Sequence, residues 1–358
     1  MNIVTILFTY TLSPYTQNPA RAMAIGIFIG GILEAAIQLP FILKQGQSFF
    51  FVSLKRAITS PGTRKVLRLV APTIIGMAAY QINDLVSTVL AANAGEGVVS
   101  SLQFSLRLQE LILGIFAVSI GTVLLPNLAE YAKTSQWEIF NQRLVSAINI
   151  IALITIPITF FSLLEGESLI CLLFLDNNFD ENSVRITLAA FTFHIPGLFF
   201  IALNRILAPA FYAQSNTKSP TIAGIISFSI NILFATILVG PYRGAGIALA
   251  LSLASAANTI LLLVFLRKNP KITIGPALFS SMLYILKLCF LSVLALFPIY
   301  FISPWVKHFF TGYGRIISYG MPLTINILLF ALFGIALLFL TKDKQLLALT
   351  RMIKKKTK

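Results

Sequence analysis

The chain has 358 residues, of which 57% are hydrophobic and only 11% are charged, whereas soluble domains carry about 25% charged residues. This composition excludes an ordinary soluble globular domain. The net charge of +15 would suit nucleic-acid binding in a soluble protein. Here the basic residues lie between apolar runs, so membrane topology and anionic headgroups explain them better, and no nucleic-acid partner is expected.

Apolar runs of about 20 residues recur along nearly the whole chain, which is the pattern of transmembrane helices. Only helices and closed barrels satisfy the backbone inside a bilayer, and these runs are too long and unbroken for barrel strands. The sequence therefore predicts an all-α polytopic membrane protein. Its ten predicted spans are 2–12, 22–43, 69–93, 103–126, 144–164, 184–212, 220–240, 244–266, 278–302 and 319–341.

The first predicted span, 2–12, would cover only about 16 Å as a helix, against roughly 30 Å of hydrocarbon. It resembles a helix cut in half, so we expect the sequence to begin inside a longer protein. Further along, the loop 44–68 contains "FFFVSLKRAI" at 49–58. This stretch is either an amphipathic segment in the membrane interface or a plain basic connector.

Lysine and arginine in the loops set the orientation of a membrane protein. They concentrate in 44–68, 127–143, 213–219, 267–277 and the tail from Lys342, which are alternate connections. This side is therefore predicted to be cytoplasmic, together with the C-terminal "KKKTK". The acidic residues lean toward the other side: Glu96, Glu165, Glu167, Asp176, Asp180 and Glu181.

The chain contains an internal sequence repeat, which we call the echo. "PTIIGMAAYQINDLVSTVL" begins at Pro72, and "PTIAGIISFSINILFATIL" begins at Pro220. Without gaps they agree at four informative pairs: Pro72/Pro220, Gly76/Gly224, Asn83/Asn231 and Thr88/Thr236. Both segments run in the same direction, so we expect a bundle built from repeated helical units, as in many transporters.

Ionisable side chains at membrane depth are costly and usually face a cavity or a partner. Six such residues away from the span ends are candidates: Glu34, Asp84, Arg107, Glu110, Arg205 and Lys287. Lys287 lies about ten residues into its span, so it either faces a cavity or a partner or snorkels to the interface.

Arg107 and Glu110 lie three residues apart on one helix face. They either neutralise each other or leave the guanidinium of Arg107 to bind an anion, for which phosphate is the best match. Glu110 is in that case a pairing or ion-coupling group. Arg205 either snorkels or acts as a second cation, and Pro209, four residues later, predicts a kink or break in its helix.

Asp84 shares a helix face with Gln81, Ser87 and Thr88, and Asn83 is adjacent. One interpretation is that this face lines a water-filled cavity, where Asp84 is also a candidate for ion coupling. The other is interhelical hydrogen bonding, worth about 0.6 kcal/mol per contact. An aspartate is a costly choice for the second role.

No metal, cofactor or catalytic site is predicted. His194 and His308 have no ligand partner at metal-binding spacing, and Cys171 and Cys289 are expected to pack as small hydrophobic residues. The sequence also has no Walker, GxSxG or HExxH motif, so it does not predict an enzyme.

Several stretches resemble the MurJ/MviN family of bacterial lipid II flippases. The strongest are "LRLQELILGIFAVSIGTVLLPNLAEYA" at 106–132 and "RILAPAFYAQSNTKSPT" at 205–221. "QIND", "LPFILKQG" and "GPYRGAGIALALSLASAANTILLLVFLRK" are also similar, and all of them fall in the family's order.

The resemblance implies a MOP-type fold of fourteen helices, of which the ten spans would be the last ten. It divides the chain into five parts: a remnant of the first lobe (1–43), a basic amphipathic linker (44–68), a six-helix lobe (69–266), an accessory helix pair for the lipid tail (267–341) and a basic cytoplasmic tail (342–358). It also implies a place in the cytoplasmic membrane and a role in cell-wall synthesis. The implied substrate is lipid II, the undecaprenyl-pyrophosphate-linked disaccharide pentapeptide.

The chain departs from the family pattern at informative positions. The family's Asp-Arg pair reads Leu106-Arg107, and Arg205 replaces a lysine. The acid found near Ser87 in many members falls one turn earlier, at Asp84, and Glu34 stands where glutamine is usual.

Our hypothesis is a flippase that works by alternating access. Arg107 and Arg205 would bind the pyrophosphate of lipid II, while Gln81, Asn83 and Asp84 would line the cavity and bind the headgroup or a coupling ion. Membrane lipids would be further partners. The alternatives are another MOP-type carrier, such as an O-unit flippase or a multidrug exporter, and a non-transporting scaffold for wall synthesis.

Overall fold

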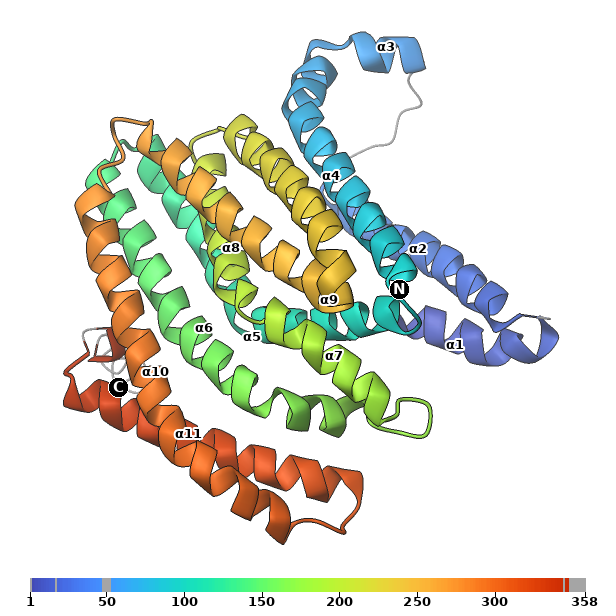
Figure 1. Cartoon of the computed structure of the whole chain (residues 1–358). Coiled ribbons are helices and arrows are strands. Elements are labelled where there is room, and N and C mark those ends of the chain that lie inside the picture. Colours follow the sequence, from blue (N-terminus) through green and yellow to red (C-terminus); the bar gives the residue numbers. More distant parts are fainter. Residues whose placement is uncertain (1, 17, 47–52, 344, 348–358) are drawn as a thin grey trace. The chain divides into compact units, whose positions relative to one another are not determined.

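The computed structural model describes residues 2–16, 18–46, 53–343 and 345–347, and these residues form helices and short connections without a strand. Figure 1 shows the helices, which are, in chain order: α1 (Asn2–Leu12), η1 (Ser13–Tyr15), α2 (Pro19–Lys44), α3 (Leu54–Thr59), α4 (Pro61–Asn93), α5 (Val98–Lys133), α6 (Trp137–Phe174), α7 (Glu181–His194), α8 (Gly197–Tyr212), α9 (Lys218–Arg267), α10 (Gly275–Phe309), η2 (Ile316–Gly320) and α11 (Met321–Leu340). The predicted all-α class is confirmed.

Six helical segments within the described ranges are long and apolar enough to cross a bilayer, or seven if the bent pair α7–α8 forms one span. They are Pro19–Lys44, Ile74–Asn93, Trp137–Phe174, Lys218–Arg267, Gly275–Phe309 and Ile316–Leu340. Each of the ten predicted apolar segments lies in a helical stretch, but the number of crossings stays a prediction.

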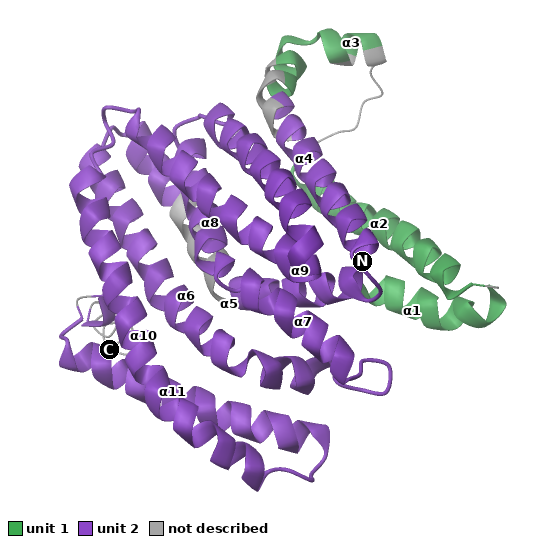
Figure 2. Ribbon diagram, viewed as in Figure 1, with its two compact units in different colours: residues 1–67 green, residues 68–358 purple. Residues whose placement is uncertain are grey.

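The chain divides into two compact units, residues 1–67 and 68–358 (Figure 2). In the first unit α1 packs against α2. The side chain of Asn18 caps α2 by accepting a hydrogen bond of 2.9 Å from the N–H of Ala20, and Pro19 occupies the first turn, where its missing N–H costs nothing. Gly26 lets the two helices approach closely, because a Cβ atom there would lie 3.0 Å from Thr5 and Phe8.

The predicted interfacial stretch 49–58 lies partly outside the described residues. Its described part belongs to α3, a short helix that carries the exposed Lys55 and Arg56. Most of the predicted cytoplasmic tail 342–358 also lies outside the described residues.

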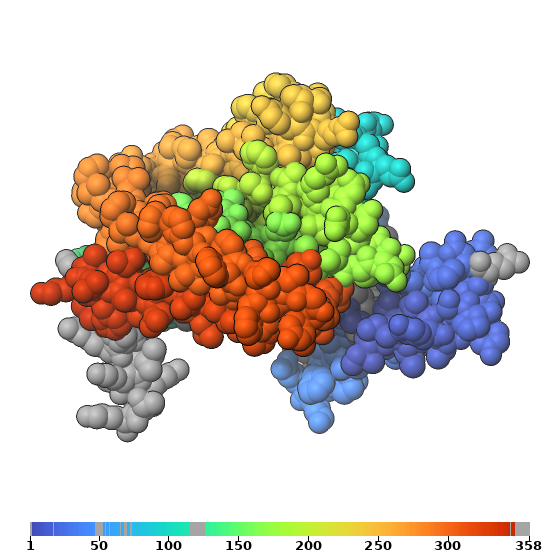
Figure 3. Space-filling view, turned by 60° about the horizontal axis from the view of Figure 1, so that its bottom comes forward, coloured from blue at the N-terminus to red at the C-terminus, as the bar shows by residue number. Residues whose placement is uncertain are grey.

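In the second unit, α8 provides the centre of the core. It buries Leu198, Ala202, Ile206 and Ala210 at intervals of four residues, and it contacts α5, α6 and α9. On the outer side of this core α10 packs against α6, and α11 packs against both α10 and α6. α10 and α11 lie side by side along one face of the unit (Figure 3).

The predicted span 184–212 consists of two helices, α7 and α8, which meet at an angle of 50°. The break follows His194, at Pro196-Gly197, and α8 then continues through Pro209 to Tyr212. The break therefore lies earlier than Pro209, where the sequence placed it. Gly197 allows it because a Cβ atom there would clash with Ser252 of α9.

The long helix α9 contains both predicted segments 220–240 and 244–266. They are separated by Arg243, whose φ of 49° and ψ of −129° are not helical. Gly246 is needed next to this kink, because a Cβ atom would collide with the carbonyl oxygen of Leu238. The two halves of α9 thus act as two helices, as the sequence predicted.

Candidate functional site

A cavity of about 110 Å³ lies between α4, α5, α7 and α9 in the second unit. Apolar side chains such as Leu102 and Ile247 form part of its wall. The polar side chains that line it come from all but the last of these helices: Asn83, Asp84, Ser87, Thr88, Gln103, Glu110 and His194. The arrangement is a small polar chamber within a largely apolar bundle.

Asn83 and Asn231 connect the two copies of the internal echo. The Nδ2 of the buried Asn231 donates to the Oδ1 of the buried Asn83 at 2.8 Å, and it also donates to Ser87 Oγ at 3.3 Å. The rings of Tyr80 and Phe228, which also occupy equivalent positions of the echo, pack edge to face at 5.8 Å. The repeated segments therefore meet at matching heights, so Asn83 has an interhelical hydrogen bond as well as a place in the cavity wall.

Asp84 also lines the cavity, but its surroundings differ. It is exposed, and it forms no ion pair with the residues that the structure describes. Ser87 and Thr88 lie beside it in the wall, as their shared helix face predicted. Gln81 is exposed on the same helix and is not among the residues that line the cavity.

Arg107 forms the intrahelical pair that its spacing suggested. Its Nη1 lies 3.0 Å from Glu110 Oε2, and the two side chains are 73% and 55% exposed. Because an exposed pair of this kind contributes little to stability, Arg107 retains donors for another anion. Glu110 lines the cavity but Arg107 does not, so the guanidinium is connected to the cavity only through its contact with Glu110.

Arg205 is exposed on α8 and does not line this cavity. Neither Arg107 nor Arg205 therefore lines the cavity in this structure. Glu34 lies in the first unit, exposed on α2. Lys287 does not simply snorkel, because its Nζ lies 2.7 Å from the Oδ2 of Asp343, just beyond α11.

His194 and Gln103 line the cavity although the sequence did not indicate them, and His194 is the better connected of the two. His194 is 1% exposed, its Nδ1 lies 2.6 Å from Ser105 Oγ, and its carbonyl oxygen accepts a hydrogen bond from Gln109. The side chain of Ser252 donates to the neighbouring carbonyl of Phe193 at 2.6 Å. The broken helix α7–α8 thus exposes carbonyl groups that α5 and α9 satisfy, and the Pro-Gly pair that follows His194 was the signal for it.

A second polar cluster, which we call the Glu165 cluster, fastens α10 and α11 to α6. Glu165 is 1% exposed. Its Oε1 accepts hydrogen bonds from Ser303 at 2.6 Å and Asn326 at 2.9 Å, and its Oε2 accepts from Ser168 at 2.7 Å and lies 3.1 Å from Lys307 Nζ. The sequence assigned Glu165 to a loop, but α6 continues past it to Phe174.

Within 2–16, 18–46, 53–343 and 345–347, no three His, Cys, Asp or Glu side chains come together as a metal-binding group. Cys171 and Cys289 are free thiols.

Long apolar helices, a broken helix pair and a polar chamber between them are features of multi-pass helical membrane proteins of the carrier type. A solved structure described as lipid II flippase MurJ in an inward closed conformation matches with a TM-score of 0.70 at 24% identity, covering 94% of this chain and 65% of that one. An outward-facing multidrug resistance MATE family transporter of the MOP superfamily matches with a TM-score of 0.53 at 14% identity, covering 81% and 68%.

The family described as lipid II flippase MurJ matches residues 1–320. A probable lipid II flippase MurJ of Treponema pallidum is 43% identical over 343 residues, which are 96% of this chain and 65% of the relative. One of Vibrio cholerae is 30% identical over 262 residues, or 73% of this chain and 49% of the relative. The chain belongs to the MurJ lipid II flippase family, and it spans about half to two thirds of the length of these relatives.

Family membership and the long apolar helices together indicate a multi-pass protein of the bacterial cytoplasmic membrane. The resemblance seen in the sequence is confirmed.

Proposed function

We propose that this chain acts in moving lipid II from the inner to the outer leaflet of the cytoplasmic membrane by alternating access. The observation that carries the proposal is the polar cavity between α4, α5, α7 and α9 in a member of the MurJ family. Relatives that are 43% and 30% identical bear the name of this activity. The comparisons favour it over a multidrug exporter, because the MATE structures resemble the chain only in fold.

The physical task is to carry a large polar head through hydrocarbon while its tail stays in lipid. A charged group that crosses the bilayer centre without partners costs at least several kcal/mol. This barrier falls when protein donors replace the water of hydration. The guanidinium of Arg107 offers planar donors that match a phosphate, and it contacts Glu110, which lines the cavity.

We assign the remaining polar residues by their positions. Asp84 and Asn83 would bind hydroxyl and amide groups of the headgroup or a coupling ion, and Gln81 would do so from the exposed side of α4. Arg205 would bind phosphate in a different state of the transport cycle, because it does not line the cavity in this structure. The membrane potential supplies about 2.3 kcal/mol per charge per 100 mV. Transport could therefore be driven without a covalent step.

We further propose ten membrane crossings with a cytoplasmic C-terminus. The lobe 69–266 would carry the cavity, and the pair 267–341 would hold the lipid tail. Reporter fusions after Lys44, Asn93, Lys133 and Lys342 test this topology. Fusions after Lys44, Lys133 and Lys342 should report the cytoplasm, and the fusion after Asn93 should report the outside.

The decisive experiment is complementation of a flippase-depleted bacterium by the gene in its complete reading frame. Wild type should restore growth and lipid II export, Arg107→Lys should restore them in part, and Arg107→Ala should fail. Export that survives Arg107→Glu while drug efflux is lost would favour a drug exporter. Function that survives Arg107→Ala but is lost when the loop 44–68 is replaced would favour a scaffold.

A further inference from the structure

A much larger pocket, of about 1130 Å³, lies at one end of the second unit, where several helices begin or end. It is formed by the last turn of α5, the start of α6, the end of α8 and both ends of α9. These connections are the ones in which lysine and arginine concentrate, so in the proposed orientation the pocket opens at the cytoplasmic surface of the membrane. It is separate from the cavity that contains Asp84.

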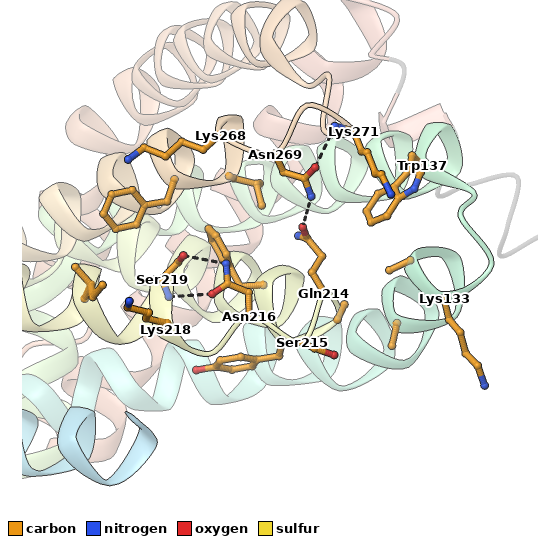
Figure 4. Close-up of a pocket in the computed structure, with 18 residues that line it drawn as sticks. Lys133, Trp137, Gln214, Ser215, Asn216, Lys218, Ser219, Lys268, Asn269 and Lys271 are labelled. Carbon is orange, nitrogen blue, oxygen red and sulfur yellow. Dashed lines mark hydrogen bonds between the residues drawn. The ribbon is translucent and has the colours of Figure 1, made fainter. Parts of the chain in front are cut away.

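Four lysines contribute to the lining of this pocket and no acidic residue does: Lys133, Lys218, Lys268 and Lys271. Figure 4 shows that Lys133 extends away from the other three. Two of the ammonium groups lie over aromatic rings: Lys271 Nζ is 5.2 Å from the ring centre of Trp137, and Lys268 Nζ is 5.2 Å from that of Phe265. None of the four is in an ion pair with an acidic side chain of the described residues.

The floor of the pocket is organised by amide and hydroxyl groups. Asn269 donates to Gln214 at 2.7 Å, and Asn216 donates to Ser219 at 2.9 Å while it accepts from the Ser219 N–H at 3.0 Å (Figure 4). Apolar groups, among them those of Ile222 and Leu266, complete the wall. The site therefore combines cationic, hydrogen-bonding and apolar surfaces.

Part of the positive charge has a simple structural explanation. Lys133 lies in the last turn of α5 and Lys268 just after α9, where a cation offsets the negative end of the helix dipole. Lys218 has no such explanation, because it is the first residue of α9, where the dipole disfavours a cation. An anion placed between Lys218 and Lys268 removes this cost.

We propose that this pocket binds the phosphate headgroup of an anionic membrane lipid. Lys218 and Lys268 would bind the phosphate, while Lys271, beside Trp137 on the opposite side of the pocket (Figure 4), would add to the positive potential, and the apolar wall would hold the carbon atoms of the lipid. A free phosphate needs only a fraction of such a volume and makes no use of the apolar wall. Basic pockets between helices at the cytoplasmic surface are well suited to anionic lipid heads.

Trp137 provides a direct test, because the chain has two tryptophans and the other, Trp305, is 81% exposed. The complete protein with Trp305→Phe is reconstituted into phosphatidylcholine vesicles. Brominated phosphatidylglycerol or brominated phosphatidylcholine is then added, and quenching of Trp137 fluorescence is measured. We expect half-maximal quenching at a roughly tenfold lower fraction of phosphatidylglycerol, which corresponds to about 1.4 kcal/mol in favour of the anionic lipid.

The triple variant Lys218→Gln, Lys268→Gln, Lys271→Gln should lose this preference. A charge-matched control, Lys44→Gln, Lys55→Gln, Lys342→Gln, should keep it, because these exposed lysines lie outside the pocket. Equal quenching by both lipids, or an equal loss of preference in both triple variants, would overturn the proposal. Native mass spectrometry of the wild type, with phosphatidylglycerol retained over phosphatidylcholine, provides a readout without the risk of a misfolded variant.

A separate arm identifies the source of the phosphate. Millimolar inorganic phosphate or pyrophosphate should leave the quenching by phosphatidylglycerol unchanged, and relief of quenching by either anion would overturn the assignment to a lipid. None of these measurements involves transport. Arg107→Ala should leave them unchanged, so the outcome is independent of the proposed function.

Discussion

Glu165 and Asp84 are both carboxylates on long apolar helices, but their surroundings are opposite. Glu165 is 1% exposed and is in contact with two serines, an asparagine and a lysine from three helices. Asp84 is exposed in the wall of the polar cavity and has no ion-pair partner among the residues described. The acid in the Glu165 cluster uses its bonding capacity to hold α6, α10 and α11 together, whereas Asp84 has bonding capacity left over, as its proposed role requires.

The comparison shows how to separate structural from functional ionisable residues in a membrane protein. Each is expensive to place in lipid, so each requires a reason. For Glu165 the reason is that both carboxylate oxygens have partners, so removing this side chain should lower the stability of the fold. For Arg107 and Asp84 the contacts within the chain are few, so their removal should cost transport instead.

The largest effect should come from Glu165→Ala. It leaves the buried Ser303 and Asn326 without their common acceptor, and an unsatisfied buried polar group costs about 1–3 kcal/mol, whereas the 41% exposed Lys307 can turn to water. Thermal unfolding in detergent should show a much lower midpoint. Glu167→Ala, two residues away and exposed, should change the free energy of unfolding by no more than about 0.5 kcal/mol, so its midpoint should stay close to that of wild type. Equal midpoints for the two variants would remove the contrast between the clusters.

Arg107→Ala should have the opposite effect, with a loss of transport and an unchanged stability. The loss of a charge-assisted hydrogen bond to phosphate, worth about 1.5–3 kcal/mol, predicts a 10- to 100-fold lower rate of lipid II export. The unfolding midpoint should hardly change, because the side chain is 73% exposed. Glu110→Gln provides the matched control, since it frees the guanidinium and should retain export. A destabilised Arg107→Ala protein would place Arg107 with Glu165 as a structural residue.

A smaller effect should be seen at the end of α11. Burial acts to raise the pKa of Asp343, but the hydrogen bond from Lys287 and the N–H of Leu346 outweigh it and lower the pKa below its ordinary value of 3.8. A lowered pKa means that the stabilisation is present above pH 3.8 and disappears as the pH falls through the pKa of the folded state.

Asp343→Asn should therefore lower the free energy of unfolding by about 1 kcal/mol at pH 7. The difference from wild type should shrink as the pH is taken below 3.8. Unfolding midpoints measured between pH 7 and pH 3 test this sign, and a difference that grows toward low pH would contradict it. Lys287→Gln should show the same dependence on pH, because it removes the other half of the pair.

The smallest effect concerns the amide pair between the two echo segments. A double-mutant cycle of Asn83→Ala and Asn231→Ala should give a coupling energy of about 0.6 kcal/mol, typical of interhelical hydrogen bonds. Thr88 and Thr236, also equivalent in the echo, provide the control cycle, for which we expect additivity. A coupling near zero for the asparagines would mean that Asn83 belongs wholly to the cavity.

Much of the fold could be predicted from the sequence, because the length of each apolar run gives the approximate extent of a helix. The ends of α1 and the two halves of α9 follow from it. The end of α6 does not, because Glu165 was taken as the start of a loop, and its partners lie more than a hundred residues away in α10 and α11. A sequence pattern cannot supply such distant contacts, and these contacts make a buried acid tolerable.

The candidate site was predictable in part for the same reason. Helical spacing placed Asp84, Ser87 and Thr88 on one wall, and the intrahelical pair of Arg107 and Glu110 follows from a separation of three residues. His194 was missed because its role depends on the break between α7 and α8. Gln81 and Arg205 lie outside the cavity wall, and helical spacing alone could not have shown this.

The hydrogen bond between Asn83 and Asn231 limits how the two echo helices can move. A slip of one helix past the other by a single turn, about 5.4 Å, would separate the amides and leave two polar groups facing apolar neighbours. Tilting about the point where they touch does not separate them. The pair is thus a pivot that allows rocking and resists sliding.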